Sequence, residues 1–273
     1  TPDISVIGPL ARSADDLYSA IKIMAGPDPI MSRGYQLNLP ELGARSLADL
    51  KVGVWKNDEA APVAQEVEAR VDLVVAALRD AGAQISENAK PEFSADHSSE
   101  VYQRLLHATM ASRMPLENYE SLKAYVQNEL DPADNSSTAQ TLRAQVSSFK
   151  DWSQANEMRH QLRWRWHEYF SEYDILLTPM MATPAFKHDQ RPFAERTLQV
   201  DNQERPYFEQ VFWAGLTGVT YLPSTVIPTG LNDSGLPIGV QIVGPQYGDL
   251  ITIGVAQRLE AMGFAFTAPT AYQ

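Results

Sequence analysis

The sequence predicts an α/β protein with a mixed central β-sheet flanked by helices, and three stretches carry that prediction. Residues 51–86 show a short apolar strand, an amphipathic helix and a second strand, which is the pattern of a parallel pair. Residues 175–178 are a short buried strand closed by Pro179. Residues 221–262 show two Val- and Ile-rich runs around a turn, followed by a loop and a helix.

The first 47 residues contain one predicted helix and one loop. Ser13 and Asp16 resemble a capping box, and apolar residues follow at helical spacing until Gly26 and Pro27 end the helix. Residues 27–47 are rich in Pro, Gly and polar side chains, which is typical of a wrapping loop.

The next unit is strand, helix, strand. Residues 51–55 form the first strand and residues 83–86 the second. The helix between them, residues 63–81, has one apolar face and ends at Gly82. That face consists of Val67, Val71, Val74 and Leu78.

The middle of the chain is mostly helical. Residues 92–145 predict two or three helices, either layered over the sheet or forming an accessory cap. Residues 146–173 predict one long helix whose apolar side chains face the core and whose arginines face outward. A long loop over 180–205 and a helix over 207–216 follow.

The closing stretch predicts a hairpin and a helix. Residues 223–228 and 236–243 are strands joined by the turn-rich segment 229–235. Asp249 then caps a helix. Its predicted inner face is Ile253, Ala256 and Leu259, with Met262 as a further member.

Composition bounds the function. The 273 residues form one large or two small domains, and 44% hydrophobic with 21% charged residues is an ordinary globular composition. With no cysteines, thiolate metal sites and a cysteine nucleophile are excluded. A net charge of −12 argues against nucleic acid as a partner, and no apolar run reaches membrane-spanning length. We therefore expect a soluble, cytoplasmic protein, processed or truncated before Thr1.

The residue types that carry chemistry form no complete set. The five histidines have no metal or triad spacing, and Gly239, Gly244 and Gly248 fit no phosphate-loop pattern. The basic and aromatic residues over 159–167 fit a helix packed on a core better than a nucleic-acid surface. Thr1 as an N-terminal nucleophile is disfavoured by the proline that follows it.

Five segments recur in the order and spacing of the amidase signature family, and the chain resembles its C-terminal part. They are DISVIGPLARSADDL at 3–17, YDILLTP at 173–179, TPA at 183–185, PSTVIPTG at 223–230 and GLPIGVQIVG at 235–244. The resemblance implies hydrolysis of a small-molecule carboxamide by a Ser–cis-Ser–Lys triad that lies before residue 1. It therefore implies no catalytic residue, metal or cofactor in this chain.

The same resemblance implies that residues 1–273 are the C-terminal portion of a single amidase domain, with a helical accessory region at about 90–150. Its partner would be the N-terminal part of the same amidase, and unpaired strand edges would favour aggregation or a homo-oligomer. The alternative is a non-catalytic degenerate homologue or a partner-binding subunit.

Six residues are predicted to form a wall of the substrate pocket, because residues at strand ends and in the following loops line ligand sites in open α/β sheets. They are Met180, Met181, Trp213, Thr217, Tyr221 and Tyr247. Such an aromatic, uncharged wall would suit an apolar or aryl carboxamide. The alternative is that these side chains belong to the core.

Overall fold

A five-stranded mixed sheet forms the centre of the protein, as predicted. The computed structural model describes residues 3–269. In spatial order the strands are β2 (Gln84–Ser86), β1 (Lys51–Val54), β3 (Ile175–Pro179), β7 (Pro237–Val243) and β6 (Ser224–Leu231). β1 is parallel to both β2 and β3, whereas β7 is antiparallel to β3 and to β6. The hairpin is therefore confirmed, with β7 inside the sheet and β6 at its edge among the described residues.

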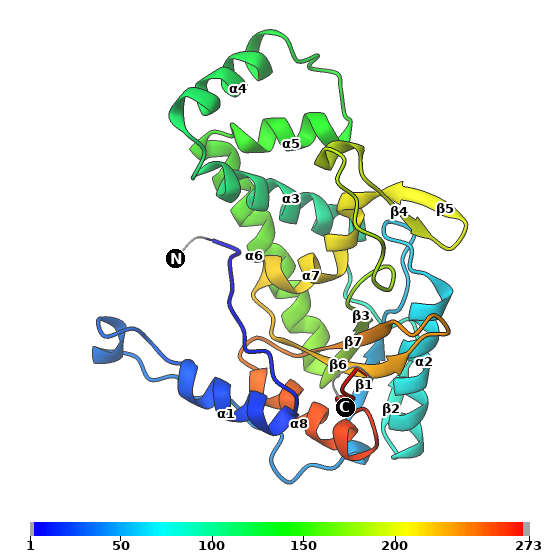
Figure 1. Ribbon diagram of the computed structural model, residues 1–273. Helices are drawn as coiled ribbons and strands as arrows, with labels where there is room; N and C mark the ends of the chain where they lie inside the picture. The colour runs from blue at the N-terminus through cyan, green and yellow to red at the C-terminus, as the bar shows by residue number, and fades with distance from the viewer. Residues whose placement is uncertain (1–2, 270–273) are drawn as a thin grey trace.

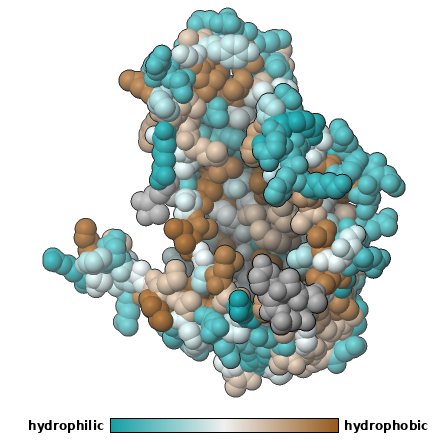
Figure 2. Space-filling model, in the orientation of Figure 1, coloured by the Kyte–Doolittle hydropathy of each residue, from teal (hydrophilic) through white to brown (hydrophobic). Residues whose placement is uncertain are grey.

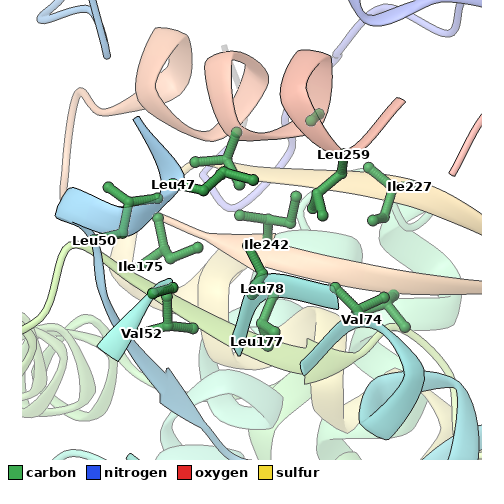
Figure 3. Close-up of a cluster of buried hydrophobic side chains, with 14 of the residues drawn as sticks. Leu47, Leu50, Val52, Val74, Leu78, Ile175, Leu177, Ile227, Ile242 and Leu259 are labelled. Atoms are coloured by element: carbon green, nitrogen blue, oxygen red, sulfur yellow. The ribbon is translucent and has the colours of Figure 1, made fainter. Parts of the chain in front are cut away.

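One face of the sheet is covered by α2 (Gln65–Asp80) and α8 (Asp249–Ala261), and α1 (Ala14–Met24) packs on α8. The predicted inner faces of α2 and α8 are buried, except that Met262 follows the end of α8 and is exposed. Figure 3 shows their side chains meeting those of the strands. Labelled members of this cluster include Val52, Val74, Ile175, Ile242 and Leu259. Burial of these aliphatic side chains, at about 25 cal/mol per Å², is the main stabilising term.

The other face is covered by α6 (Phe149–Glu172) and α7 (Phe212–Thr220), which contribute large aromatic side chains. α6 begins three residues later than predicted because Ser148 caps it through a capping box with Asp151. Trp55, at the end of β1, meets Trp213 of α7 edge to face at 5.6 Å. The aliphatic and aromatic clusters therefore lie on opposite faces of one sheet.

Three helices form a cap at the end of α6 that lies far from the sheet (Figure 1). They are α3 (Ala95–Ala111), α4 (Leu116–Asn128) and α5 (Ser137–Gln145). α3 packs on α5, α6 and α7, through a third apolar cluster that includes Val101, Leu105 and Leu162. α4 buries no residue. Of the two predicted arrangements, this is the cap and not a layer over the sheet.

The predicted loop over 180–205 is wrong in its second half. β4 (Thr197–Val200) and β5 (Gln203–Pro206) form an antiparallel hairpin there. Its two-residue turn places Asp201 at φ +51, which is the left-handed backbone that tight hairpins require. The Asp201 carboxylate also accepts the N–H of Gln65 at the start of α2. A tertiary contact therefore supports a hairpin in which β4 alternates buried apolar and polar residues but β5 does not.

The predicted helix over 207–216 is displaced. A 3₁₀ turn, η4 (Tyr207–Val211), precedes α7, which runs on to Thr220. The other 3₁₀ turns are η1 (Met31–Arg33), η2 (Leu47–Asp49) and η3 (Phe193–Glu195). Among residues 3–269, no helix combines the length and the apolar character needed to cross a membrane.

Candidate functional site

Four of the six predicted pocket residues lie at two opposite ends of the sheet, and the other two lie on α7. The register pairs Leu176 with Val243 and Pro179 with Val240, so β7 ends where β3 begins. Met180 and Met181 follow β3 and therefore lie at the far end from Tyr247, which follows β7. Four residue steps of a strand separate the two ends by about 13 Å. The rule that residues at strand ends gather at one edge holds only for parallel strands, and β7 is antiparallel to β3.

Trp213 and Thr217 lie on α7 between those two ends and point into the protein. Trp213 has no exposed surface, and its carbonyl accepts a hydrogen bond from Gln241 Nε2 at 3.4 Å. The Thr217 hydroxyl donates to the carbonyl of Ala214 at 3.0 Å. In this structure both side chains are part of the interior, and a contact with substrate stays a prediction.

Tyr221 and Tyr247 share an uncommon backbone conformation. Their φ angles are +61° and +67°, and both side chains are exposed. A non-glycine residue in this left-handed region costs about 1 kcal/mol or more. Tyr221 ends α7 and donates its backbone N–H to the carbonyl of Thr217. The two tyrosines are therefore fixed by their backbones at one end of the sheet.

Around Tyr221 the structure brings together charged residues that sequence patterns did not connect. Arg159 donates to both carboxylate oxygens of Asp3, at 2.9 and 2.7 Å, and the Tyr221 hydroxyl donates to Asp3 Oδ1 at 3.0 Å. The Arg159 guanidinium lies 4.8 Å from the centre of the Tyr221 ring. We call these three residues the Asp3 clamp. Burial, together with the hydrogen bond to Asp3, raises the pKa of the Tyr221 hydroxyl.

The clamp corrects the prediction that the arginines of the long helix face outward. Arg159 is buried, because Asp3 supplies the negative charge that a buried guanidinium requires. Its neighbour Arg163 also lies against the Tyr221 ring, at 5.4 Å, and donates to Gln246 Oε1 at 2.8 Å. Helical periodicity located the buried face of α6, but it could not show that an arginine lies on that face.

A cavity of about 800 Å³ lies between the helical cap and the chain around η3 and η4. Its polar lining includes Gln103 and His107 from α3 and Thr141 from α5. Its aromatic lining comes from the other side, from Phe193, Tyr207, Phe208 and Phe212. None of the six predicted residues lines this cavity. The only sequence signal for it was the density of aromatic residues between 186 and 212.

The cavity lining contains titratable groups of both signs, and His107 is the most buried histidine among them. Burial lowers the pKa of His107, so its imidazole is neutral near pH 7. His107 Nε2 lies 3.0 Å from Gln103 Oε1 and 3.4 Å from the Thr141 hydroxyl. Among residues 3–269, no group of three or more acidic or histidine side chains is placed to hold a metal ion. Thr1, weighed as a nucleophile, lies outside the described residues.

On the face shown in Figure 2, hydrophobic side chains gather along the N-terminal stretch that runs between the helical cap and α1. The large apolar residues exposed in this stretch are Val6, Ile7 and Leu10. Three neighbouring apolar side chains in water are unusual for a segment of a folded protein.

The structure is an α/β protein, and its sequence contains five segments in the order and spacing found in the amidase signature family. Comparison with protein families supports the same assignment. The family described as Amidase matches residues 1–252. The chain therefore belongs to the amidase signature family, as the resemblance predicted.

Curated relatives give the scale of the match. A glutamyl-tRNA(Gln) amidotransferase subunit from a Synechococcus species is 29% identical over 279 residues, covering 93% of this chain and 54% of the relative. Indoleacetamide hydrolase of Bradyrhizobium diazoefficiens is 25% identical over 263 residues, covering 94% of this chain and 46% of the relative. The chain thus spans about half the length of these relatives.

Solved structures share the fold. A bacterial aryl acylamidase of the amidase signature family aligns with a TM-score of 0.68 at 21% identity, covering 93% of this chain and 52% of that one. The glutamyl-tRNA(Gln) amidotransferase subunit of Thermotoga maritima aligns with a TM-score of 0.68 at 18% identity, covering 96% and 55%. The predicted fold class, with a mixed sheet flanked by helices, is therefore confirmed.

Proposed function

We propose that residues 1–273 supply scaffold and one pocket wall to an amide hydrolase of the amidase signature type, whose catalytic triad lies before residue 1. The observation that carries this proposal is the family match over residues 1–252. The match to only about half of each relative is consistent with it. In this proposal residues 1–273 are the C-terminal portion of a single amidase domain, with α3, α4 and α5 as its accessory region.

The reaction would be acyl transfer to water. A serine of the preceding segment attacks the amide carbon, a lysine acting through the bridging serine moves the proton, and backbone N–H groups stabilise the oxyanion. The substrate is a small carboxamide, the setting is cytoplasmic, and no cofactor takes part. Tyr221 and Tyr247 are the predicted wall residues with the most exposed rings.

The geometry of the edge strand β6 is consistent with a partner segment that pairs with it. The strand order ends at β6, which pairs only with β7 among the described residues. Along β6, buried and exposed residues alternate, and Val226 is among the exposed ones. An unpaired edge of this kind is a template for another strand. The N-terminal part of the same amidase is the partner we propose for it, and a homo-oligomer is the other arrangement.

Two measurements test the proposal. The coding sequence on the 5′ side of the Thr1 codon should encode a Gly/Ser-rich stretch with one lysine and two serines. Purified residues 1–273 should hydrolyse no amide, whereas the complete reading frame should hydrolyse small carboxamides. Amide hydrolysis by a verified preparation of residues 1–273 would overturn the proposal.

The second candidate is a non-catalytic homologue or partner-binding subunit. The observation that favours it is the exposed apolar N-terminal stretch, which a partner chain could cover. A start codon beside the Thr1 codon, together with stable association with a second protein and no hydrolysis, would support this candidate over the first.

A further inference from the structure

The cavity beneath the helical cap has an aromatic wall that continues beyond it. Phe186 lies 5.8 Å from Tyr207, and Phe193 lies 5.2 Å from both Tyr207 and Phe208. Phe208 in turn lies 5.9 Å from the His107 ring. Phe186, Phe193 and Phe208 are all exposed large apolar side chains. We call this series the aromatic wall. Phe186 and Phe193 each meet Tyr207 edge to face, and the contacts of Phe208 with Phe193 and His107 are tilted, so the wall offers ring surfaces against which a further flat ring can pack.

One cation at this wall, Arg196, forms no ion pair within residues 3–269, although it lies close enough to Asp189 to interact with its charge. Arg196 lies over the Phe193 ring at 4.6 Å and near the Tyr207 ring at 5.8 Å. Its Nε donates to the carbonyl of Arg191 at 2.8 Å. Within residues 3–269, no carboxylate lies within ion-pair distance of Arg196, and Asp189 pairs instead with Arg191 at 2.7 Å. The Arg196 guanidinium therefore keeps donors free, in the fork geometry that suits a carboxylate.

Of the other charged side chains that line the cavity, Asp96 forms no ion pair within residues 3–269, and three more are paired. Arg104 pairs with Glu100 at 3.4 Å, and Glu209 pairs with Arg205 at 2.7 Å. His107 is neutral near pH 7 for the reason given above. The backbone N–H of Tyr207 donates to the carbonyl of Arg196 at 3.2 Å, which holds the cation beside the rings.

We propose that this cavity binds a small aromatic carboxylate, with its ring against Phe193 and Tyr207 and its carboxylate on Arg196. The volume of about 800 Å³ lies within the range of small-molecule sites. In this proposal the aromatic side chains bind the ring of the ligand through apolar contacts. Arg196 binds the ligand carboxylate and favours it over a neutral amide. This inference does not rest on the proposed hydrolase function, because binding is measurable without turnover.

Isothermal titration of the protein with benzoate tests the proposal. Benzoate should bind saturably at millimolar concentration or below, and Arg196→Gln should weaken binding about 10-fold or more through loss of a charge-assisted pair. Arg33→Gln is the matched control, because Arg33 is exposed on η1 and lines neither this cavity nor its smaller neighbour. It should leave the affinity unchanged.

Ligand variants separate the two parts of the site. Cyclohexanecarboxylate should bind about 3- to 10-fold more weakly than benzoate, because it lacks the ring–ring term. Benzamide should also bind more weakly, and Phe193→Leu should reduce the preference for benzoate over cyclohexanecarboxylate. Circular dichroism of each variant establishes that it is folded. Absence of saturable benzoate binding, equal affinity of folded Arg196→Gln, or equal affinity for the two acids would each overturn the proposal.

Discussion

Removing one or the other member of the Asp3 clamp should have unequal effects on stability. The Arg159 side chain is 4% exposed and that of Asp3 is 24% exposed. Asp3→Ala therefore leaves a charge that water can hardly reach, whereas Arg159→Met leaves a carboxylate at the surface. Both substitutions break the hydrogen bonds between Arg159 and Asp3. Asp3→Ala also removes the acceptor of the Tyr221 hydroxyl, and Arg159→Met also removes the hydrogen bonds to Asn156, so the double variant is needed to isolate the cost of the unpaired charge.

The magnitudes follow from those exposures. An unpaired buried charge costs about 3–5 kcal/mol, so Asp3→Ala should lower the free energy of unfolding by that amount. Arg159→Met replaces the buried cation by an apolar side chain, and its cost should stay at about 1–2 kcal/mol. With a urea m value of about 2 kcal/mol/M, a difference of about 2 kcal/mol separates the two midpoints by about 1 M.

The assay is equilibrium urea unfolding followed by tryptophan fluorescence, with the double variant completing a mutant cycle. Asp3→Ala combined with Arg159→Met should be about as stable as Arg159→Met alone, because no unpaired buried charge remains. The reasoning is refuted if Asp3→Ala is no more destabilising than Arg159→Met at equal m values.

Three further predictions concern other parts of the protein. Burial lowers the pKa of His107 in the folded protein, so the unfolded chain takes up a proton on this imidazole more readily. The free energy of unfolding should therefore fall as the pH drops below about 6.5, by at most about 1.4 kcal/mol per pH unit. Urea midpoints measured from pH 7 to pH 5 should show a smaller fall for His107→Gln than for the unsubstituted protein. In Gly53→Ala the new methyl group would overlap the hydroxyl of Tyr169, so thermal unfolding should show a free energy of unfolding lower by about 1–3 kcal/mol. Adding Tyr169→Phe should recover part of this loss. Gly34→Ala is the control and should cost far less, because the space around Gly34 is open. Val226→Lys on the edge strand should reduce self-association in sedimentation velocity without changing the circular dichroism spectrum, and unchanged association would exclude β6 as the contact.

Most of the fold was predictable, because hydrophobic periodicity and caps act locally. The strand at 51–54, the helix face from Val67 to Leu78 and the hairpin of β6 and β7 all follow from spacing within one segment. The hairpin of β4 and β5 was missed because β5 (Gln203–Pro206) has no apolar alternation and the hairpin depends on contacts such as Asp201 with Gln65. Local patterns do not encode such a contact, which spans 136 residues.

The candidate site was much less predictable. The antiparallel register of β3 and β7 separates Met180 from Tyr247, and no pattern in the sequence specifies which neighbour β3 takes. The Asp3 clamp joins residues 156 positions apart. The aromatic wall likewise combines a loop, a 3₁₀ turn and a helix from distant segments. The sequence shows which segments contain charged or aromatic residues. Which of these residues come into contact depends on the tertiary fold.

The strand order also has a consequence for synthesis on the ribosome. β1 pairs with β3 through Val52 and Ile175, which are 123 positions apart (175 − 52). At about 5–20 residues per second, β1 waits roughly 6–25 s for β3. During that interval the apolar side chains of β1 lack half of their final neighbours, while the helices of the cap are completed first. The nascent chain therefore passes through a stage in which a chaperone that binds apolar segments has its longest opportunity to act.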